Sequence, residues 1–226
     1  MERIKLRIAK ATSDFSSGVA FVCRQHLIGK KRKNIDCLRQ AAVSFQKLLP
    51  VKYRIIVGKK GKSFELNIAF KEDNFFHLSG LHKISSHLLK LPRVKIFHSI
   101  LKGEISDATF NNYVSSPEIL ERIKILSQLE KLLDDEQTSF FKYDSNKVAF
   151  SKISADYLAK GTVNDEQIFF AFFVKNGVKG DLNYYANSIF PLKNYDFSKN
   201  QTKYTILLKE KFLDGNATTL YRHKKY

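Results

Sequence analysis

Residues 53–84 constrain the fold of this chain more than any other stretch, because they join two strand patterns, a short turn and a helix pattern. Over residues 63–70, apolar and polar side chains alternate, which is typical of a strand with one buried face. Gly58 and Gly61 lie between the two strand patterns and can supply the positive φ angles of a tight loop. The stretch therefore predicts a β-hairpin with a short, cationic turn.

The hairpin runs directly into a predicted helix that carries two histidines. Asp73 or Asn74 can cap this helix by accepting hydrogen bonds from its first free amides. His82 follows His77 by five positions, which on a regular helix places the two side chains roughly 140° apart. Both can face one pocket only if the helix begins after His77. An apolar stripe docks the helix on the core: Leu78, Leu81 and Leu88.

The rest of the chain predicts helices first and strands later. Residues 1–50 read as a helical region, although residues 4–8 alternate and form a candidate strand. A further helix starts at Ser116-Pro117-Glu118, and short β-rich runs follow from residue 138. Residues 168–174 are continuously apolar, as in a central strand buried on both faces. We expect one α+β domain over residues 1–226, with an antiparallel sheet backed by helices.

Charge is the strongest global signal in the sequence. The chain has 39 lysines and arginines against 22 acidic residues, a net charge of +17. Residues 1–60 hold 15 of the basic residues against three acidic ones, so this basic front alone carries +12. Such a field attracts a polyanion, either nucleic acid or a lipid surface; the alternative is a solubility device or a lysine-rich proteome. We expect phosphate contacts from these cations: Lys30, Lys31, Arg32, Lys33, Arg39, Lys59, Lys60 and, near the end of the chain, Arg222.

Several classes of protein and site are disfavoured by what the sequence lacks. No apolar run is long enough to span a bilayer, and charges interrupt the N-terminal region where a signal peptide needs an apolar block. With only two cysteines, a disulfide framework is not expected, so we predict a protein of the reducing cytoplasm that makes no membrane contact. Phosphate loops, zinc motifs and paired acidic clusters for magnesium are missing too, so we expect no cofactor and no metal site.

The remaining chemistry points to cleavage of RNA without a metal ion. Such cleavage needs a base for the 2′-hydroxyl, an acid for the leaving oxygen and a cation beside the charged phosphorane. Histidine suits both proton transfers, because its pKa lies near neutrality. His77 or His82 is therefore the candidate base or acid, with the adjacent Lys83 as the cation.

Three short motifs carry a family resemblance: residues 74–81 (NFFHLSGL), 184–190 (YYANSIF) and 201–204 (QTKY). With these motifs, residues 35–210 resemble the phage and mobile-element branch of the barnase, EndoU, colicin and RelE-like ribonuclease superfamily. The resemblance implies a metal-independent ribonuclease with a helix-plus-antiparallel-sheet fold. Such proteins often act as toxins or in conflict between mobile elements and their hosts. We accordingly expect a basic helical front over residues 1–50 and a nuclease-like region over residues 51–210.

The resemblance also implies roles for particular residues. His77 matches the histidine of the F-H-L-x-G-L motif, and Ser188 matches the serine of the Y-x-x-x-S-x-F motif, where it would orient the phosphate. Ala186 stands where relatives often have proline, which changes the local turn. Lys203 or Tyr204 could point from the following strand into the same cleft, with Lys203 adding positive charge. The expected partner is RNA, together with a neutralising antitoxin or a host nucleoprotein.

A function from another class stays open at this point. A nucleic-acid-binding regulator, or a phage inhibitor that occupies a host nucleoprotein defence complex, would need the same charge and no catalysis. RNA cleavage in the presence of a chelator separates the two hypotheses.

Overall fold

The computed structural model describes residues 36–84, 90–110, 117–148, 151–163, 167–175, 177–193 and 195–226. The predictions for residues 1–35, including the phosphate contacts of Lys30, Lys31, Arg32 and Lys33, lie outside these residues, as does the stripe residue Leu88. The predicted single domain over residues 1–226 stays a prediction.

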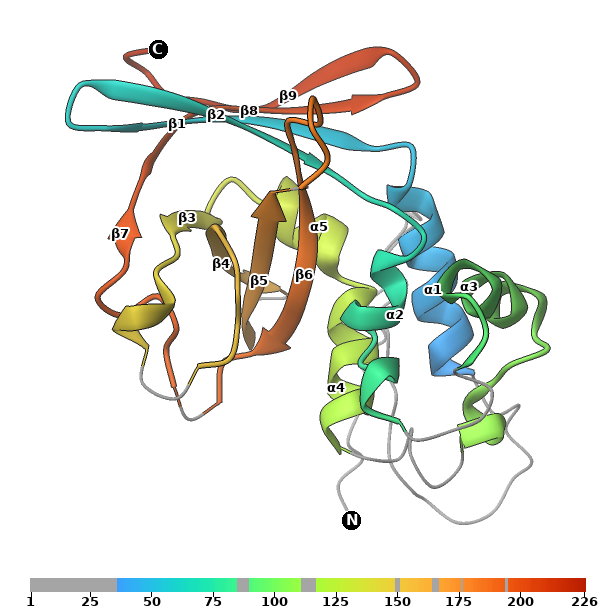
Figure 1. Ribbon diagram of the computed structural model, residues 1–226. Coiled ribbons are helices and arrows are strands. Elements are labelled where there is room, and N and C mark those ends of the chain that lie inside the picture. The colour runs from blue at the N-terminus through green and yellow to red at the C-terminus, as the bar shows by residue number, and fades with distance from the viewer. Residues whose placement is uncertain are drawn as a thin grey trace, which may run out of the picture. The chain divides into compact units, whose positions relative to one another are not determined.

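One large, curled sheet of nine strands organises the described residues, in the order β7-β3-β4-β5-β6-β2-β1-β8-β9 (Figure 1). The strands are β1 Lys52–Lys59, β2 Lys62–Ala69, β3 Ser139–Lys142, β4 Tyr157–Val163, β5 Gln167–Lys175, β6 Asn183–Pro191, β7 Thr202–Lys203, β8 Thr205–Leu213 and β9 Asn216–Arg222.

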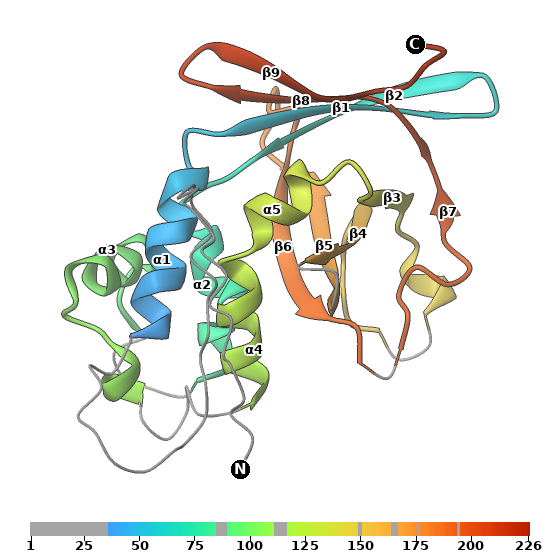
Figure 2. The same ribbon diagram turned by 180° about the vertical axis from the view of Figure 1, so that it is seen from behind.

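Five α-helices accompany the sheet within the described residues. They are α1 Cys37–Leu48, α2 Asn74–Leu78, α3 Arg93–Lys102, α4 Pro117–Leu126 and α5 Leu129–Asp134, with 3₁₀ turns η1 Leu81–Lys83, η3 Asp107–Phe110 and η4 Ser145–Lys147. Figures 1 and 2 show α1 to α4 gathered beside β6, whereas α5 lies beneath β1 and β8. The predicted α+β class is confirmed.

The sheet is mixed, so the prediction of an antiparallel sheet needs a correction. All neighbouring strands pair antiparallel except β2 and β6, which run parallel through Asn67–Ala69 and Asn183–Tyr185. Antiparallel neighbours can be joined by a tight turn, but parallel neighbours need a long crossover. Here more than a hundred residues, which include α2 to α5 and three strands, connect β2 to β6. The strand patterns could not show this pairing.

The predicted hairpin is confirmed, with its turn at two residues. Lys60 and Gly61 have φ angles of 50° and 76°, the combination of a type I′ turn between β1 and β2. Gly58, the other glycine expected in the turn, instead lies inside β1. A Cβ atom there would approach Leu207 of β8 to 3.1 Å, so the glycine serves close packing between strands.

The sequence signals of the longer helices also match the structure. The carboxylate of Asp36 accepts a hydrogen bond from the Arg39 amide at 3.0 Å and caps α1, whose buried face includes Leu38 and Phe45. The helix predicted from Pro117 is present, but it breaks after Leu126 and continues as α5. At α2, by contrast, Asp73 makes no capping hydrogen bond with its side chain.

The core lies on both faces of the central strand β5. Phe170, Ala171, Phe172 and Phe173 are all buried, which confirms the predicted strand. Helix α5 packs closely on the neighbouring strand β4. A Cβ atom added at Gly161 of β4 would lie 2.6 Å from Leu132 of α5, so only glycine leaves room for the helix there.

A cluster of polar side chains fastens α5 to β1 and β8. The Tyr53 hydroxyl donates a hydrogen bond to Asp134 at 2.6 Å. Lys211 forms ion pairs with Asp134 and Glu130 at 2.8 and 2.7 Å, and the buried Lys209 donates to the Asp135 carbonyl at 2.6 Å. We call these side chains the anchoring cluster: Tyr53, Glu130, Asp134, Lys209 and Lys211.

Candidate functional site

A left-handed glycine brings the two histidines of the central unit together. Helix α2 ends at Leu78, and Gly80, with a φ of 83°, turns the chain into η1. The imidazole rings of His77 and His82 consequently lie with their centroids 5.0 Å apart and their planes at 47°. Adjacency was expected only if the helix began after His77; instead the helix ends between the two residues.

The space beside Gly80 is filled by an arginine of α4. A Cβ atom at position 80 would lie 3.0 Å from the Cδ atom of Arg122. Alanine would therefore meet two obstacles at this position, the strained φ angle and the arginine side chain. Gly80 thus sets the positions of both imidazoles relative to Arg122.

The surroundings of His77 favour its neutral form. Partial burial lowers the pKa of His77, the positive charge of Arg93 lowers it further, and the carboxylate of Asp73 opposes both effects. Arg93 belongs to α3 and lies with its guanidinium 5.7 Å from the centre of the Phe76 ring. One Oδ atom of Asp73 is buried and has no hydrogen-bond partner among the described residues.

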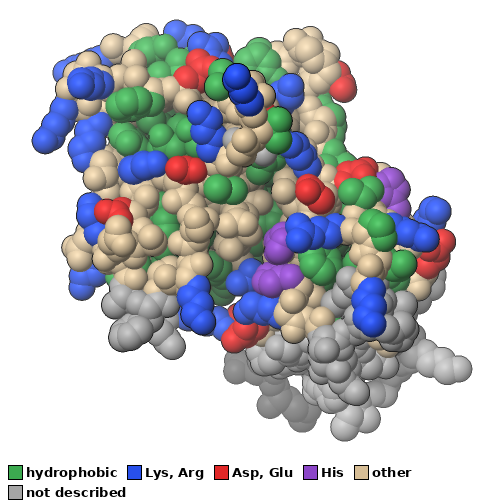
Figure 3. Space-filling model, in the orientation of Figure 1, with side chains coloured by type: hydrophobic (Ala, Val, Ile, Leu, Met, Phe, Trp, Pro, Cys, Tyr) green, Lys and Arg blue, Asp and Glu red, His purple; other side chains and the backbone are tan. Residues whose placement is uncertain are grey.

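His82 lies in a similar environment with more cations. Burial lowers its pKa first, followed by the charges of His77, Arg122 and Lys83, while a hydrogen bond with the Phe76 backbone raises it. Both imidazoles therefore release their protons more readily than free histidine, and they lie among three cations from η1, α3 and α4. Figure 3 shows adjacent histidine side chains among lysines and arginines on one face of the molecule.

Arg122 is the most deeply placed of these cations. Its guanidinium lies 5.7 Å from the centre of the Phe190 ring, a cation–π contact with β6. Burial lowers the pKa of Arg122, with partial opposition from Glu118. Within the described part of the chain it forms no ion pair, since the Glu118 carboxylate is bound at 2.8 Å to Lys83. Arg122 is thus a charged group whose compensation is incomplete.

A cavity of about 290 Å³ opens beside Lys83 and Arg122. Strand β6 supplies its opposite wall through Phe190. Ser188 lies two residues before Phe190 and pairs with Phe172 of β5, so Ser188 and Phe190 share one face of β6. The structure thus places the predicted serine on the strand that borders this cavity.

Lys203 lies away from the histidines. It belongs to β7, the short edge strand, which β3, β4 and β5 separate from β6. There it lines another cavity, of about 560 Å³, together with Tyr204, Tyr221 and His223. The structure therefore does not bring Lys203 to the predicted cleft, because β7 pairs with β3 and not with the strand that carries Ser188. Tyr204 follows β7, and its ring lies with its centroid 6.2 Å from that of Tyr157 of β4.

The cations predicted to hold flanking RNA are distributed over several elements. Lys59 and Lys60 lie at the tip of the β1–β2 hairpin, and Arg222 ends β9 on the other side of β8. Arg39 is on α1, where its Nε atom donates to the Leu101 carbonyl of α3 at 3.0 Å. Arg39 therefore has a structural contact in addition to any contact with phosphate.

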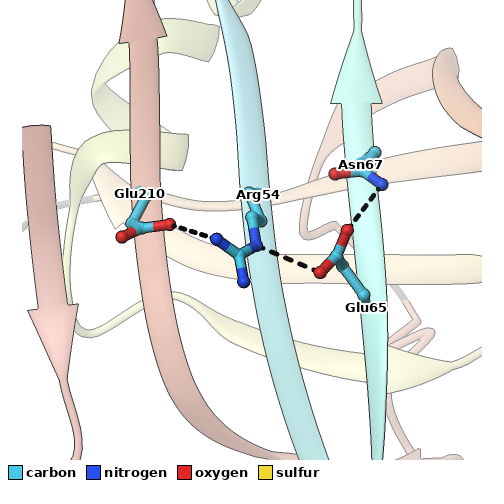
Figure 4. Close-up of polar contacts among 4 residues, drawn as sticks. All are labelled: Arg54, Glu65, Asn67 and Glu210. Atoms are coloured by element: carbon cyan, nitrogen blue, oxygen red, sulfur yellow. Dashed lines mark hydrogen bonds and ion pairs between the residues drawn. The ribbon is translucent and has the colours of Figure 1, made fainter. Parts of the chain in front are cut away.

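Another cation of the hairpin is fully engaged by carboxylates. Arg54 of β1 forms ion pairs with Glu65 of β2 at 3.0 Å and Glu210 of β8 at 3.2 Å, and Asn67 donates to Glu65 (Figure 4). This row of residues ties three strands together across the sheet. Arg54 is accordingly part of the scaffold.

The sequence reasoning missed Arg93 and Arg122. The buried face of helix α4 includes Ile119 and Ile123. Arg122 stands between these two residues, three positions after Ile119, and so borders the buried face. An arginine beside the apolar face of a helix is unusual, and this position could have marked Arg122 as a candidate site residue from the sequence alone. Arg93 gave no comparable signal.

Among the described residues, no group of three or more His, Cys, Asp or Glu residues is arranged to hold a metal ion. No described helix is long and apolar enough to cross a membrane.

Comparison with known proteins identifies the family. No curated protein and no solved structure matches the chain. A family model does match residues 37–225, which include α1, the hairpin, the histidine turn and the whole sheet. Its description is phage-Barnase-EndoU-ColicinE5/D-RelE like nuclease4, in agreement with the resemblance seen in the sequence motifs. The chain therefore belongs to this family of phage-Barnase-EndoU-ColicinE5/D-RelE like nucleases.

Proposed function

We propose that this protein is an endoribonuclease that cleaves RNA without a metal ion and leaves 2′,3′-cyclic phosphate ends. The observation that carries the proposal is the close pair of imidazoles, 5.0 Å apart, among the charges of Lys83, Arg93 and Arg122. Membership of a nuclease family makes nucleic acid the substrate. The 2′-hydroxyl that this chemistry needs is present in RNA and absent from DNA.

The reaction needs two proton transfers. One neutral imidazole takes the proton of the 2′-hydroxyl, whose oxygen attacks the neighbouring phosphorus. The bond from phosphorus to the 5′-oxygen breaks, and the other imidazole, in its protonated form, gives this oxygen a proton. The products are a 2′,3′-cyclic phosphate and a free 5′-hydroxyl, and the two histidines have exchanged protonation states.

The cations stabilise the phosphorane, which carries more negative charge than the phosphodiester. Arg122 is suited to this role because it is partly buried and no carboxylate neutralises it directly. Lys83 can contribute once it leaves Glu118, and Arg93 approaches from the side of His77. Ser188 orients the phosphate from β6. Lys203, which lies elsewhere, is not included in this set.

The test is cleavage of a defined RNA by purified protein in excess chelator, with analysis of the product ends. We expect discrete fragments with 2′,3′-cyclic phosphates, and a matching DNA strand should stay intact. The His77→Ala/His82→Ala variant should lose cleavage by at least about 10⁴-fold while it retains RNA binding. Unchanged cleavage by that variant would remove both histidines from the mechanism, and the absence of cleavage by the wild type would favour a non-catalytic RNA-binding protein.

For the biological role of this activity, we keep the prediction made from the sequence. A cytoplasmic toxin or a protein of phage and host conflict would use this activity. A neutralising antitoxin or a host nucleoprotein would be its partner.

A further inference from the structure

The cavity beside the histidine pair has an aromatic wall that the cleavage step does not use. Phe190, Tyr195 and Phe197 line it together with Lys83 and Arg122. Its volume of about 290 Å³ is at the small end of ligand pockets, a size that suits a single ring system.

Core packing accounts for only part of this wall. Phe190 stacks on Phe172 at 5.2 Å, and Phe197 meets Phe170 at 5.6 Å, so one side of each ring belongs to the core. Tyr195 contacts Phe197 edge-on at 5.2 Å but keeps 37% of its surface exposed. Because Tyr195 lines the cavity and is partly exposed, part of its ring is available to a ligand.

Charged groups border the aromatic wall. Lys193 forms an ion pair with Glu121 at 2.6 Å, and Lys83 forms one with Glu118 at 2.8 Å. Both pairs involve partly exposed side chains, so each can open at a small energetic cost. With Arg122, the rim holds three cations and two carboxylates. A ligand with a flat ring and an attached phosphate would match this combination.

We propose that this cavity binds one nucleobase of the RNA, next to the phosphodiester held at the histidines. The inference rests on the proposed function, since it places the base beside the scissile bond. The ring stacks on the partly exposed Tyr195, while Lys83, Lys193 and Arg122 attract the adjoining phosphate. Base stacking on aromatic side chains tolerates different bases and contributes substantially to binding of single strands.

The chain contains no tryptophan, so one substitution creates a specific optical probe of this cavity. In the Tyr195→Trp variant, a nucleoside 3′-monophosphate should quench the tryptophan fluorescence and saturate. Ribose 5-phosphate and inorganic phosphate, which lack a base, should give less than a tenth of that response. The matched control is Phe64→Trp, which places the probe at another exposed aromatic position, on β2; its fluorescence should not respond at the same concentrations.

Cleavage supplies a second readout. Tyr195→Ala should raise KM about tenfold or more, within the range of a lost base stack, and Tyr195→Phe should cleave like the wild type. The subsite is overturned if the Tyr195→Trp fluorescence does not respond and Tyr195→Ala cleaves normally, and the proposed function then still stands. If the wild type cleaves no RNA but nucleotides quench the Tyr195→Trp variant, the proposed function fails and the base site remains.

Discussion

The anchoring cluster and the histidine site are both groups of polar side chains where helices meet the sheet, yet their charges are balanced differently. In the anchoring cluster, Asp134 accepts from Tyr53 and Lys211, and Glu130 holds the same lysine. At the histidine site, Arg122 has no ion pair among the described residues, and the two imidazoles add further groups that can become positive.

The difference separates a structural role from a chemical one. In the anchoring cluster, two carboxylates neutralise Lys211 and a backbone carbonyl accepts from the buried Lys209, so an added anion would find no accessible free charge there. The histidine site has a surplus of positive charge: burial lowers the pKa of His82 most, and the neighbouring cations lower it further, which costs stability in the free protein. A phosphodiester would supply the missing negative charge. Five predictions follow from this contrast, in order of decreasing effect.

The largest effect should come from removing one cation from each region. Arg122→Gln should reduce RNA cleavage by about 100-fold, because it removes charge from beside the phosphorane, with little loss of stability. Lys211→Gln should leave cleavage by the folded protein unchanged and lower the free energy of unfolding by about 2 kcal/mol, because Asp134 and Glu130 lose their partner. Steady-state kinetics and urea unfolding of both variants measure this; equal losses of activity would contradict the contrast.

Lys209 is the one member of the anchoring cluster with a backbone carbonyl as its partner, and its stability contribution should depend on pH. Burial lowers the pKa of Lys209 to about 8, from 10.5, so above pH 8 the unfolded chain binds this proton more tightly than the folded protein does. The wild type should therefore gain roughly 3 kcal/mol relative to Lys209→Met as the pH rises from 8 to 10.5. The measurement is the free energy of unfolding of both proteins between pH 8 and 10.5. If the difference between them stays constant over this range, the pKa of Lys209 is not lowered in the folded protein.

The histidine site should respond to pH in the acidic range. Since the pKa values of His77 and His82 are both lowered, the protonated acid becomes scarce above pH 6.5, and we expect cleavage to be fastest below that value. Arg122→Gln removes a charge that lowers the pKa of His82, so its optimum should move toward neutrality. If the pH profile of kcat/KM is the same in this variant as in the wild type, the charge of Arg122 does not influence the pKa of His82.

Stability should follow the same titration. The unfolded chain takes up protons below pH 6.5 before the folded protein does, so stability present above 6.5 is lost as the pH falls. The His77→Asn/His82→Asn variant lacks these groups and should lose less stability between pH 6.5 and 5. Unfolding in urea at both pH values measures the difference.

The smallest effect is expected at the hairpin tip. Lys59→Thr with Lys60→Asn keeps a residue suited to the positive φ angle and removes two charges. RNA binding should weaken a few-fold at every sequence, and the slope of log K against log salt should fall by about two if both lysines contact phosphate. Lys131→Gln, on the exposed side of α5, is the control and should change neither quantity.

Local signals predicted the hairpin, α1, the start of α4 and the buried strand β5, because each depends on neighbouring residues. The alternation over residues 63–70 and the apolar run at 168–174 needed no knowledge of the remaining chain. Strand order was different: whether Lys203 or Tyr204 reaches the cleft depends on β7 pairing with β3, a long-range choice. The same limit hid the parallel pairing of β2 with β6.

The candidate site shows the same difference between local signals and long-range contacts. His77 and His82 were identified from their spacing, but their proximity depends on Gly80, whose φ angle no periodicity specifies. Arg93 and Arg122 come from helices that are adjacent only after folding. Sequence reasoning thus found the groups that can transfer protons, and tertiary structure was needed to find the charges around them.

The left-handed Gly80 has a genetic consequence. An allele with alanine at this position would keep every ionisable group of the protein and yet separate the two rings, since the turn between them would have to change. A survey that judges family members by their proton-carrying residues alone would score such an allele as active. Under the proposed mechanism, such an allele would lose RNA cleavage through a residue with no side chain.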